Sequence, residues 1–217
     1  MREDFQAELD RVSSTLVTMA RAVRETMRQA SNALLTADHT MARQVTVRDD
    51  EIDVLYRVTE DRAYDLVAGQ QRIAVDLRKA VTAIQVAADL KRMSGLAVHV
   101  ARSVLRRHPT PAVVPELAEL FRAMSTVADE LSGKIVSALS GHDAVLAAQL
   151  DRDDDAMDHL HQRLFAVLLS PDWPMGVEAA IDGALLGRYY ERYADNAVNV
   201  GHHVVVLVTG GQATTPV

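Results

Sequence analysis

The sequence predicts an all-α protein in which six long helices form two pseudo-repeated three-helix bundles. Proline, which breaks helix interiors, does not occur before residue 109, and five of the six prolines lie within 109–115 and 171–174. Aromatic residues make up only 4% of the chain, so the core must be aliphatic, and a core rich in Ala and Leu favours helices. In addition, the second half of the chain repeats the first.

The first half contains three predicted helices. Apolar residues recur every three or four positions over 5–34, which is the stripe of an amphipathic helix packed on its neighbours. Asp38 is a candidate N-cap for the second helix, whose apolar pattern covers 41–66 and ends near Gly69. The third helix is expected over about 73–105.

The segment 108–115 contains three of the six prolines and is the predicted boundary between the halves. The helical pattern restarts with Pro115, a residue that suits the first position of a helix. A turn at 141–143 separates the fourth helix from a fifth, which is expected to run to about Leu169. The sixth helix is expected over about 175–208.

The two halves are related in sequence, which predicts duplication of a three-helix unit. With a shift of 105 residues, nine of the 23 positions in 33–55 are identical to those in 138–160. In the last helix of each half the shift becomes 100, and the matched residues are Arg92 and Arg192, Ala97 and Ala197, Val98 and Val198, Val100 and Val200. The predicted units are residues 1–108 and 116–209, and residues 210–217 form a predicted flexible tail.

Three acidic pairs with a spacing of four residues are the candidate functional residues. They are Asp49 and Asp53, Asp154 and Asp158, and Glu191 and Asp195. Four residues are just over one helical turn, so each pair shares a face, where like charges repel by about a few tenths of a kcal/mol. Multivalent cations are one compensation, since carboxylate clusters suit hard cations and iron. Ordinary solvated acids on an acidic protein of net charge -7 are the alternative.

Composition excludes several classes of function. The net charge of -7 argues against a nucleic-acid binder, and the absence of cysteine excludes thiolate metal sites. The polar N-terminus and the lack of a long apolar run predict a cytoplasmic protein.

Asp158 and His161 form a carboxylate-x-x-His pair, but a di-iron bundle needs two such pairs. No catalytic motif is present, so we do not expect an enzyme.

Several of these segments resemble signatures of the PhoU family. They are 89–98 (DLKRMSGLAV), 190–200 (YERYADNAVNV), 49–53 (DDEID), 154–158 (DDAMD) and 76–78 (DLR), and the resemblance covers the chain to about Val208. It implies multinuclear metal sites of iron, zinc or magnesium at Asp49, Asp53, Asp154, Asp158, Glu191 and Asp195. The third helix departs from this pattern, because Lys91 and Gly95 stand where the sixth helix has Glu191 and Asp195. Lys91 is therefore expected to replace a metal by an internal charge.

The resemblance also implies a role between other proteins. PhoU-like proteins act between the ATPase of the phosphate ABC transporter and a phosphate-sensing histidine kinase. They are negative regulators of phosphate uptake and of phosphate-starvation (Pho regulon) signalling, without catalysis, and a homodimer is expected. Two alternatives stay open. One is a ferritin-like carboxylate bundle with an enzymatic or storage role, and the other is a helical adaptor that binds no metal.

Overall fold

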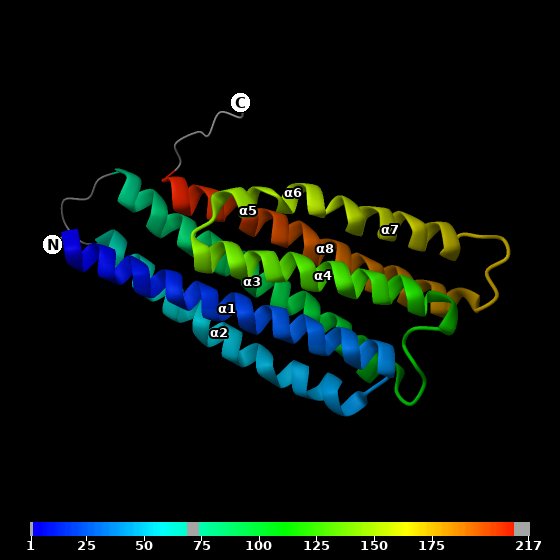
Figure 1. Cartoon of the computed structure of the whole chain (residues 1–217). Helices are drawn as coiled ribbons and strands as arrows, with labels where there is room; N and C mark the ends of the chain where they lie inside the picture. The colour runs from blue at the N-terminus through cyan, green and yellow to red at the C-terminus, as the bar shows by residue number, and fades with distance from the viewer. Residues whose placement is uncertain (1, 69–73, 211–217) are drawn as a thin grey trace.

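The computed structural model describes residues 2–68 and 74–210. Within these ranges all regular elements are helices, as Figure 1 shows, so the predicted all-α class is confirmed. The helices are α1 (Arg2–Thr36), α2 (His39–Ala68), α3 (Ala74–Arg107), α4 (Pro115–Gly141), α5 (Ala144–Ala148), α6 (Leu150–Asp153), α7 (Asp155–Leu168) and α8 (Gly176–Thr209). Gly210 ends α8 in the left-handed conformation, with φ 69. The rest of the predicted tail, 211–217, lies outside the described residues.

The helices form six rods, because α5, α6 and α7 follow one another along a single line (Figure 1). The predicted six-helix architecture is therefore confirmed, with the fifth rod divided into three short helices. The interruptions fall at Gln149 and Asp154, whose backbones stay in the right-handed helical region. Four of the five residues in 151–155 are aspartates, whose side chains compete for backbone hydrogen bonds and disfavour helix interiors.

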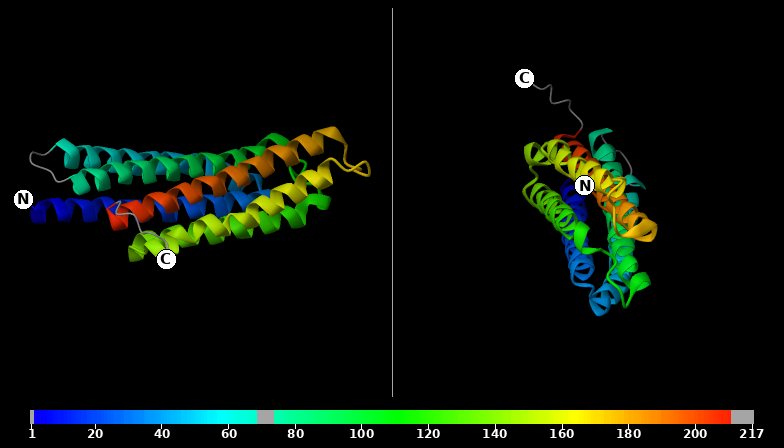
Figure 2. Two further views of the ribbon diagram at one scale, coloured as in Figure 1. Left: turned by 90° about the horizontal axis from the view of Figure 1, so that it is seen from above. Right: turned by 90° about the vertical axis from the view of Figure 1, so that its right-hand side faces the viewer.

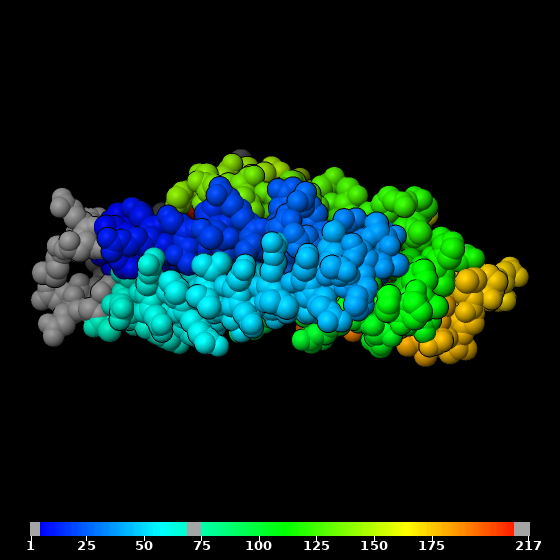
Figure 3. Space-filling model, turned by 90° about the horizontal axis from the view of Figure 1, so that it is seen from below, coloured from blue at the N-terminus to red at the C-terminus, as the bar shows by residue number. Residues whose placement is uncertain are grey.

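The rods run along the long axis of the molecule, as two further views show (Figure 2). In the first half, α3 packs against both α1 and α2, and in the second half α8 packs against α4, α5 and α7. The halves are joined by α3 against α8 and by α1 against α4. Seen from below, α1 and α2 cover most of one face side by side (Figure 3).

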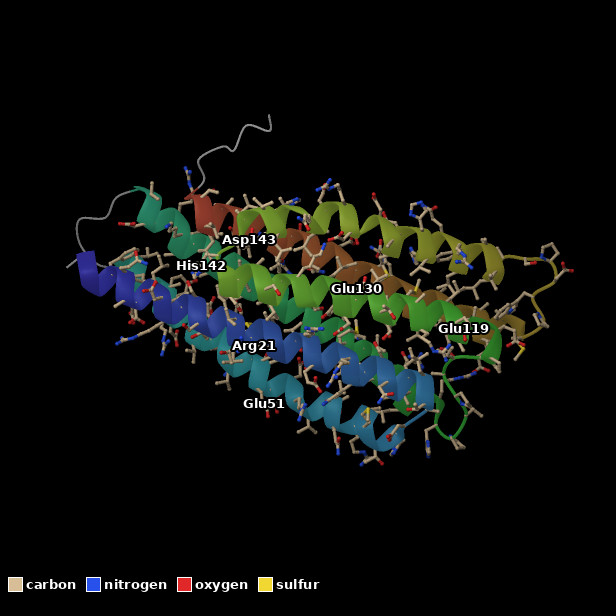
Figure 4. The ribbon with its side chains drawn as sticks, viewed as in Figure 1. Arg21, Glu51, Glu119, Glu130, His142 and Asp143 are labelled. Atoms are coloured by element: carbon tan, nitrogen blue, oxygen red, sulfur yellow. The ribbon has the colours of Figure 1, made fainter. Side chains whose placement is uncertain are left out.

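The turns after α1 and α4 repeat one another in atomic detail. Ala37 and His142, which are 105 residues apart, both have left-handed backbones, with φ 53 and φ 50. The next residues, Asp38 and Asp143, each accept a hydrogen bond at Oδ1 from the backbone amide three residues on, at 2.9 Å in both turns. The prediction of Asp38 as an N-cap is thus confirmed, and Figure 4 shows its counterpart Asp143 beside His142.

The core is mainly aliphatic, but its largest fully buried side chains are Tyr190 and Tyr193 of α8. Each tyrosine hydroxyl forms one hydrogen bond with a serine hydroxyl on a neighbouring rod. Tyr190 pairs with Ser31 of α1 at 2.7 Å, and Tyr193 pairs with Ser132 of α4 at 2.8 Å. Since α8 contacts a helix of each half in this way, the two halves share one core.

Candidate functional site

Asp154, Asp158, Glu191 and Asp195 form what we call the second-half acidic group. Asp154 lies between α6 and α7, Asp158 lies in the first turn of α7, and the other two lie on α8, against which α7 packs. Burial first, and then the negative charges of Asp158, Asp195 and Glu191, raise the pKa of the Asp154 carboxyl to about 6. The structure therefore brings together the four carboxylates that the sequence placed on separate helices.

Of the two acids of this group on α8, Glu191 is the more buried, with 16% of its side chain exposed. Burial and the neighbouring Asp195 raise the pKa of the Glu191 carboxyl, while Arg188 and His161 lower it. Arg188 Nη1 donates to the Glu191 carboxylate. Asp195 is exposed, because a step of four residues turns its side chain about 40° further round the helix.

His161 of α7 lies beside this group. Its Nε2 atom is buried and has no hydrogen-bond partner. The ring packs against α8 at Gly187, where an added Cβ would lie 3.3 Å from His161 Cδ2 and 2.3 Å from Leu164 Cδ2. The glycine thus allows α7 to approach α8 closely and places an imidazole next to the carboxylates.

Asp49 and Asp53 of α2 form the first-half acidic group, and both are bound by residues of α3. Lys91 Nζ lies 2.9 Å from Asp53 Oδ1, and Ser94 Oγ donates a 2.8 Å hydrogen bond to Asp49 Oδ1. Lys91 Nζ also lies 5.1 Å from the centre of the Tyr56 ring, a cation–π distance. The roles of Ser94 and Tyr56 were not predicted, because nothing in their local sequence marks them.

The two groups differ in how well they suit a cation. Among the residues that the structure describes, no three His, Asp or Glu side chains are placed to hold a metal ion. The donor types of the second-half group, four carboxylates beside an imidazole nitrogen without a partner, nevertheless suit a hard or borderline divalent cation. The first-half group suits a cation less well, since the Lys91 ammonium already contacts Asp53.

The fold and the site define a class of protein: an all-α bundle of duplicated three-helix units that carries acidic pairs on equivalent helices. The family model described as "PhoU domain" matches residues 16–104 and 121–204, so the chain belongs to the PhoU family. Two matches to one family model confirm the duplication, and the matched segments begin 105 residues apart and end 100 residues apart, in agreement with the two shifts.

Relatives match over nearly their whole length. The chain is 42% identical over 210 residues to "Phosphate-specific transport system accessory protein PhoU homolog 2" of Mycobacterium tuberculosis (strain ATCC 25618 / H37Rv), covering 97% of this chain and 99% of the relative. It is 40% identical over 210 residues to "PhoU homolog 1" of Mycobacterium leprae, covering 97% and 95%.

Solved structures match equally widely. PhoU from Pseudomonas aeruginosa superposes with a TM-score of 0.85 at 27% identity, covering 95% of this chain and 99% of that one. The phosphate transport system regulatory protein PhoU from Streptococcus pneumoniae gives 0.79 at 22% identity, covering 96% and 99%, and shares the fold. In the described part of the chain, no helix has the length and apolar character needed to cross a membrane.

Proposed function

We propose that this chain is an accessory regulator of phosphate transport. It is a negative regulator of phosphate uptake and of phosphate-starvation signalling, and it acts as an adaptor between the transporter ATPase and a sensor histidine kinase. The observation that carries this proposal is the 42% identity, over 97% of this chain and 99% of the relative, to a protein named as a phosphate transport accessory protein. The match covers nearly the whole of both chains.

An adaptor role in the cytoplasm without catalysis agrees with the chemistry of the described residues. Several buried polar side chains are used in structural contacts: Asp182 of α8 pairs with Arg106 of α3 at 2.9 Å, and Tyr190 and Tyr193 each pair with a serine. Long rods packed side by side offer broad faces to partner proteins (Figure 3). A homodimer is part of the proposal.

We further propose that the second-half acidic group holds divalent cations. The support is electrostatic: burial and three neighbouring carboxylates raise the pKa of Asp154 to about 6, so ionising the whole group is unfavourable without positive charge. The carboxylates would hold the cation, and His161 Nε2 lies nearby as a nitrogen donor. Iron, zinc and magnesium each suit part of this donor set.

The adaptor proposal is tested by affinity capture with the tagged full-length chain in cells grown in high phosphate. We expect recovery of the transporter ATPase and of the sensor kinase, with a tagged unrelated helical protein as control. A deletion strain should express phosphate-scavenging genes constitutively in rich phosphate. Capture of neither partner, together with normal repression in the deletion strain, would count against the proposal. Ferroxidase turnover by the purified protein would instead favour the ferritin-like alternative.

A further inference from the structure

One position of the repeated unit carries opposite charges in the two halves. With the shift of 100 residues, Lys91 on α3 corresponds to Glu191 on α8, and Gly95 corresponds to Asp195. The partner acids on the adjoining rods are the same in both halves, because Asp49 and Asp53 correspond to Asp154 and Asp158. The first half therefore has the Lys91 ammonium and a glycine at the positions where the second half has its second pair of acids, Glu191 and Asp195.

The Lys91 ammonium is held in this place by two contacts. Its Nζ is 2.9 Å from Asp53 Oδ1, and it lies 5.1 Å from the centre of the Tyr56 ring. The pair is enclosed in part, with 42% of the Lys91 side chain and 32% of the Asp53 side chain exposed. The other acid of this group, Asp49, is satisfied by the Ser94 hydroxyl at 2.8 Å. Both first-half acids therefore already have partners from α3.

We infer that Lys91 supplies in the first half the positive charge that a divalent cation supplies in the second half, so that this chain binds such a cation in its second half only. The part of this inference that concerns the second half rests on the proposed function, whereas the part that concerns the first half stands on the Lys91 contacts alone.

The two arrangements respond differently to the surroundings. A bound cation stabilises the folded state in proportion to the logarithm of its concentration, because it binds the folded state alone. The Lys91 ammonium belongs to the chain and is present at every cation concentration. A divalent cation entering the first half would have to displace Lys91 from Asp53 and would be repelled by its charge. The second half is thus the cation-dependent half of the molecule.

The structure also shows how a cation site can be rebuilt in the first half. A Cβ added at Gly95 meets no atom within 4 Å, so the backbone position leaves room for a side chain to begin there, as Gly95→Asp requires. Together with Lys91→Glu, it restores on α3 the pair that α8 carries as Glu191 and Asp195. The pair Lys91→Gln and Gly95→Asn is the matched neutral control, because it changes the same positions to similar shapes without adding charge.

The test uses Mn²⁺ as the probe, with binding measured by equilibrium dialysis and by electron paramagnetic resonance. The parent carries Asp154→Asn, Asp158→Asn and Asp195→Asn, which removes three of the four second-half acids. We expect this parent and the neutral control to bind Mn²⁺ weakly at most, and the variant of this parent with Lys91→Glu and Gly95→Asp, the rebuild, to bind it about tenfold or more tighter. Equal Mn²⁺ binding by parent and rebuild, or none by the rebuild, would overturn the inference.

A second measurement does not depend on how well the rebuilt pair folds. In the same parent, Lys91→Gln should lower the thermal midpoint, and Mn²⁺ should raise the midpoint of this variant more than that of the parent. An equal effect of Mn²⁺ on both would show that Lys91 does not stand in the place of a cation. If the wild-type chain binds no Mn²⁺, the proposed second-half site fails, while the comparison of parent, rebuild and control still decides the role of Lys91.

Discussion

Arg24 of α1 and Asp129 of α4 form a bidentate ion pair between the two halves of the molecule. Arg24 Nε donates to Asp129 Oδ1 at 2.7 Å, and Arg24 Nη2 donates to Asp129 Oδ2 at 2.8 Å. The two residues are 105 apart, so they occupy equivalent positions in the duplicated unit. The ion pair therefore joins the same position of the two repeated units. In a symmetric dimer of identical units, the same residue from each unit would meet at this position. A duplicated chain can instead place an arginine opposite an aspartate there.

The first prediction concerns this ion pair. The hydrogen bonds from Arg24 lower the pKa of the Asp129 carboxyl below its ordinary value of 3.8. A lowered pKa in the folded state contributes stability above the unfolded pKa and loses it as the pH falls through the folded value. We expect Asp129→Asn to lower the free energy of unfolding by about 1 kcal/mol at neutral pH, since a third or more of each side chain is exposed to screening. Urea unfolding measures this loss.

The pH dependence and a matched control separate the pair from general charge effects. The difference between wild type and Asp129→Asn should begin to shrink as the pH falls through about 3.8, and it should disappear only below the lower pKa that Asp129 has in the folded state. Glu119→Gln removes an acid from the exposed Glu119–Arg122 pair on the same helix, where Figure 4 labels Glu119. That variant should change stability by less than about 0.5 kcal/mol. An equal loss in both variants would contradict the special role of the cross-half pair.

Much of the fold could be predicted because its signals are local. Periodicity and proline positions give the rods, and the match between halves gives the duplication, down to the N-cap at Asp38. The acidic pairs could be placed beside the apolar stripes for the same reason, since the helical repeat fixes the direction of a side chain relative to its neighbours.

Contacts between rods could not be predicted in this way. The partner of Arg24 lies 105 residues further along the chain, and the partner of Asp49 is Ser94 on another helix. Which residue lies opposite depends on how the rods are rotated and shifted against each other, and periodicity within one helix does not determine that. The helical repeat fixes the angle between the Glu191 and Asp195 side chains, but the position of α7 against α8 decides that Asp195 is the exposed one.

The second prediction compares two helical glycines. At Gly201 of α8, an added Cβ would lie 2.8 Å from the backbone oxygen of Ala147 and 2.8 Å from Leu150 Cδ1, so the start of the fifth rod would have to move. We expect Gly201→Ala to lower the free energy of unfolding by about 1–3 kcal/mol, as overpacking does. At Gly95 nothing lies within 4 Å, so Gly95→Ala should raise it by up to about 1 kcal/mol through helix propensity. Chemical denaturation of both variants checks the opposite signs, and equal signs would contradict the close approach at Gly201.

The third prediction concerns a core hydrogen bond. The buried Tyr190 hydroxyl pairs with Ser31 at 2.7 Å and thereby ties α8 to α1. Tyr190→Phe should lower the free energy of unfolding by about 1–2 kcal/mol, because the Ser31 hydroxyl loses this partner in a buried site. In the double variant Tyr190→Phe with Ser31→Ala both polar groups are gone, so part of the loss should be recovered. A double-mutant cycle measures the coupling, and additive losses would show that the two hydroxyls do not act as a pair.

The last prediction concerns the stability of the second-half acidic group without divalent cations. Burial first, and then Asp158, Asp195 and Glu191, raise the pKa of Asp154 to about 6, above its ordinary value of 3.8. An acid with a raised pKa in the folded state destabilises the fold at higher pH, and this cost falls as the pH drops below about 6. In buffer with a chelator at neutral pH, we expect Asp154→Asn to raise the free energy of unfolding, because it removes a carboxylate that its neighbours repel. The gain should be about 1 kcal/mol, since solvent screens part of the repulsion. Urea unfolding at neutral pH measures this gain.

Three further measurements decide whether that gain reflects the carboxylate cluster. The gain should disappear below about pH 4, where the folded and unfolded states both carry a protonated Asp154. The exposed neighbour Asp155 provides the control, and Asp155→Asn should change stability by less than about 0.5 kcal/mol. Adding Mn²⁺ should reverse the order at neutral pH, because a cation bound by the wild-type group stabilises it by mass action and the variant has lost one carboxylate. A gain that persists at low pH would mean that Asp154→Asn acts through packing rather than charge.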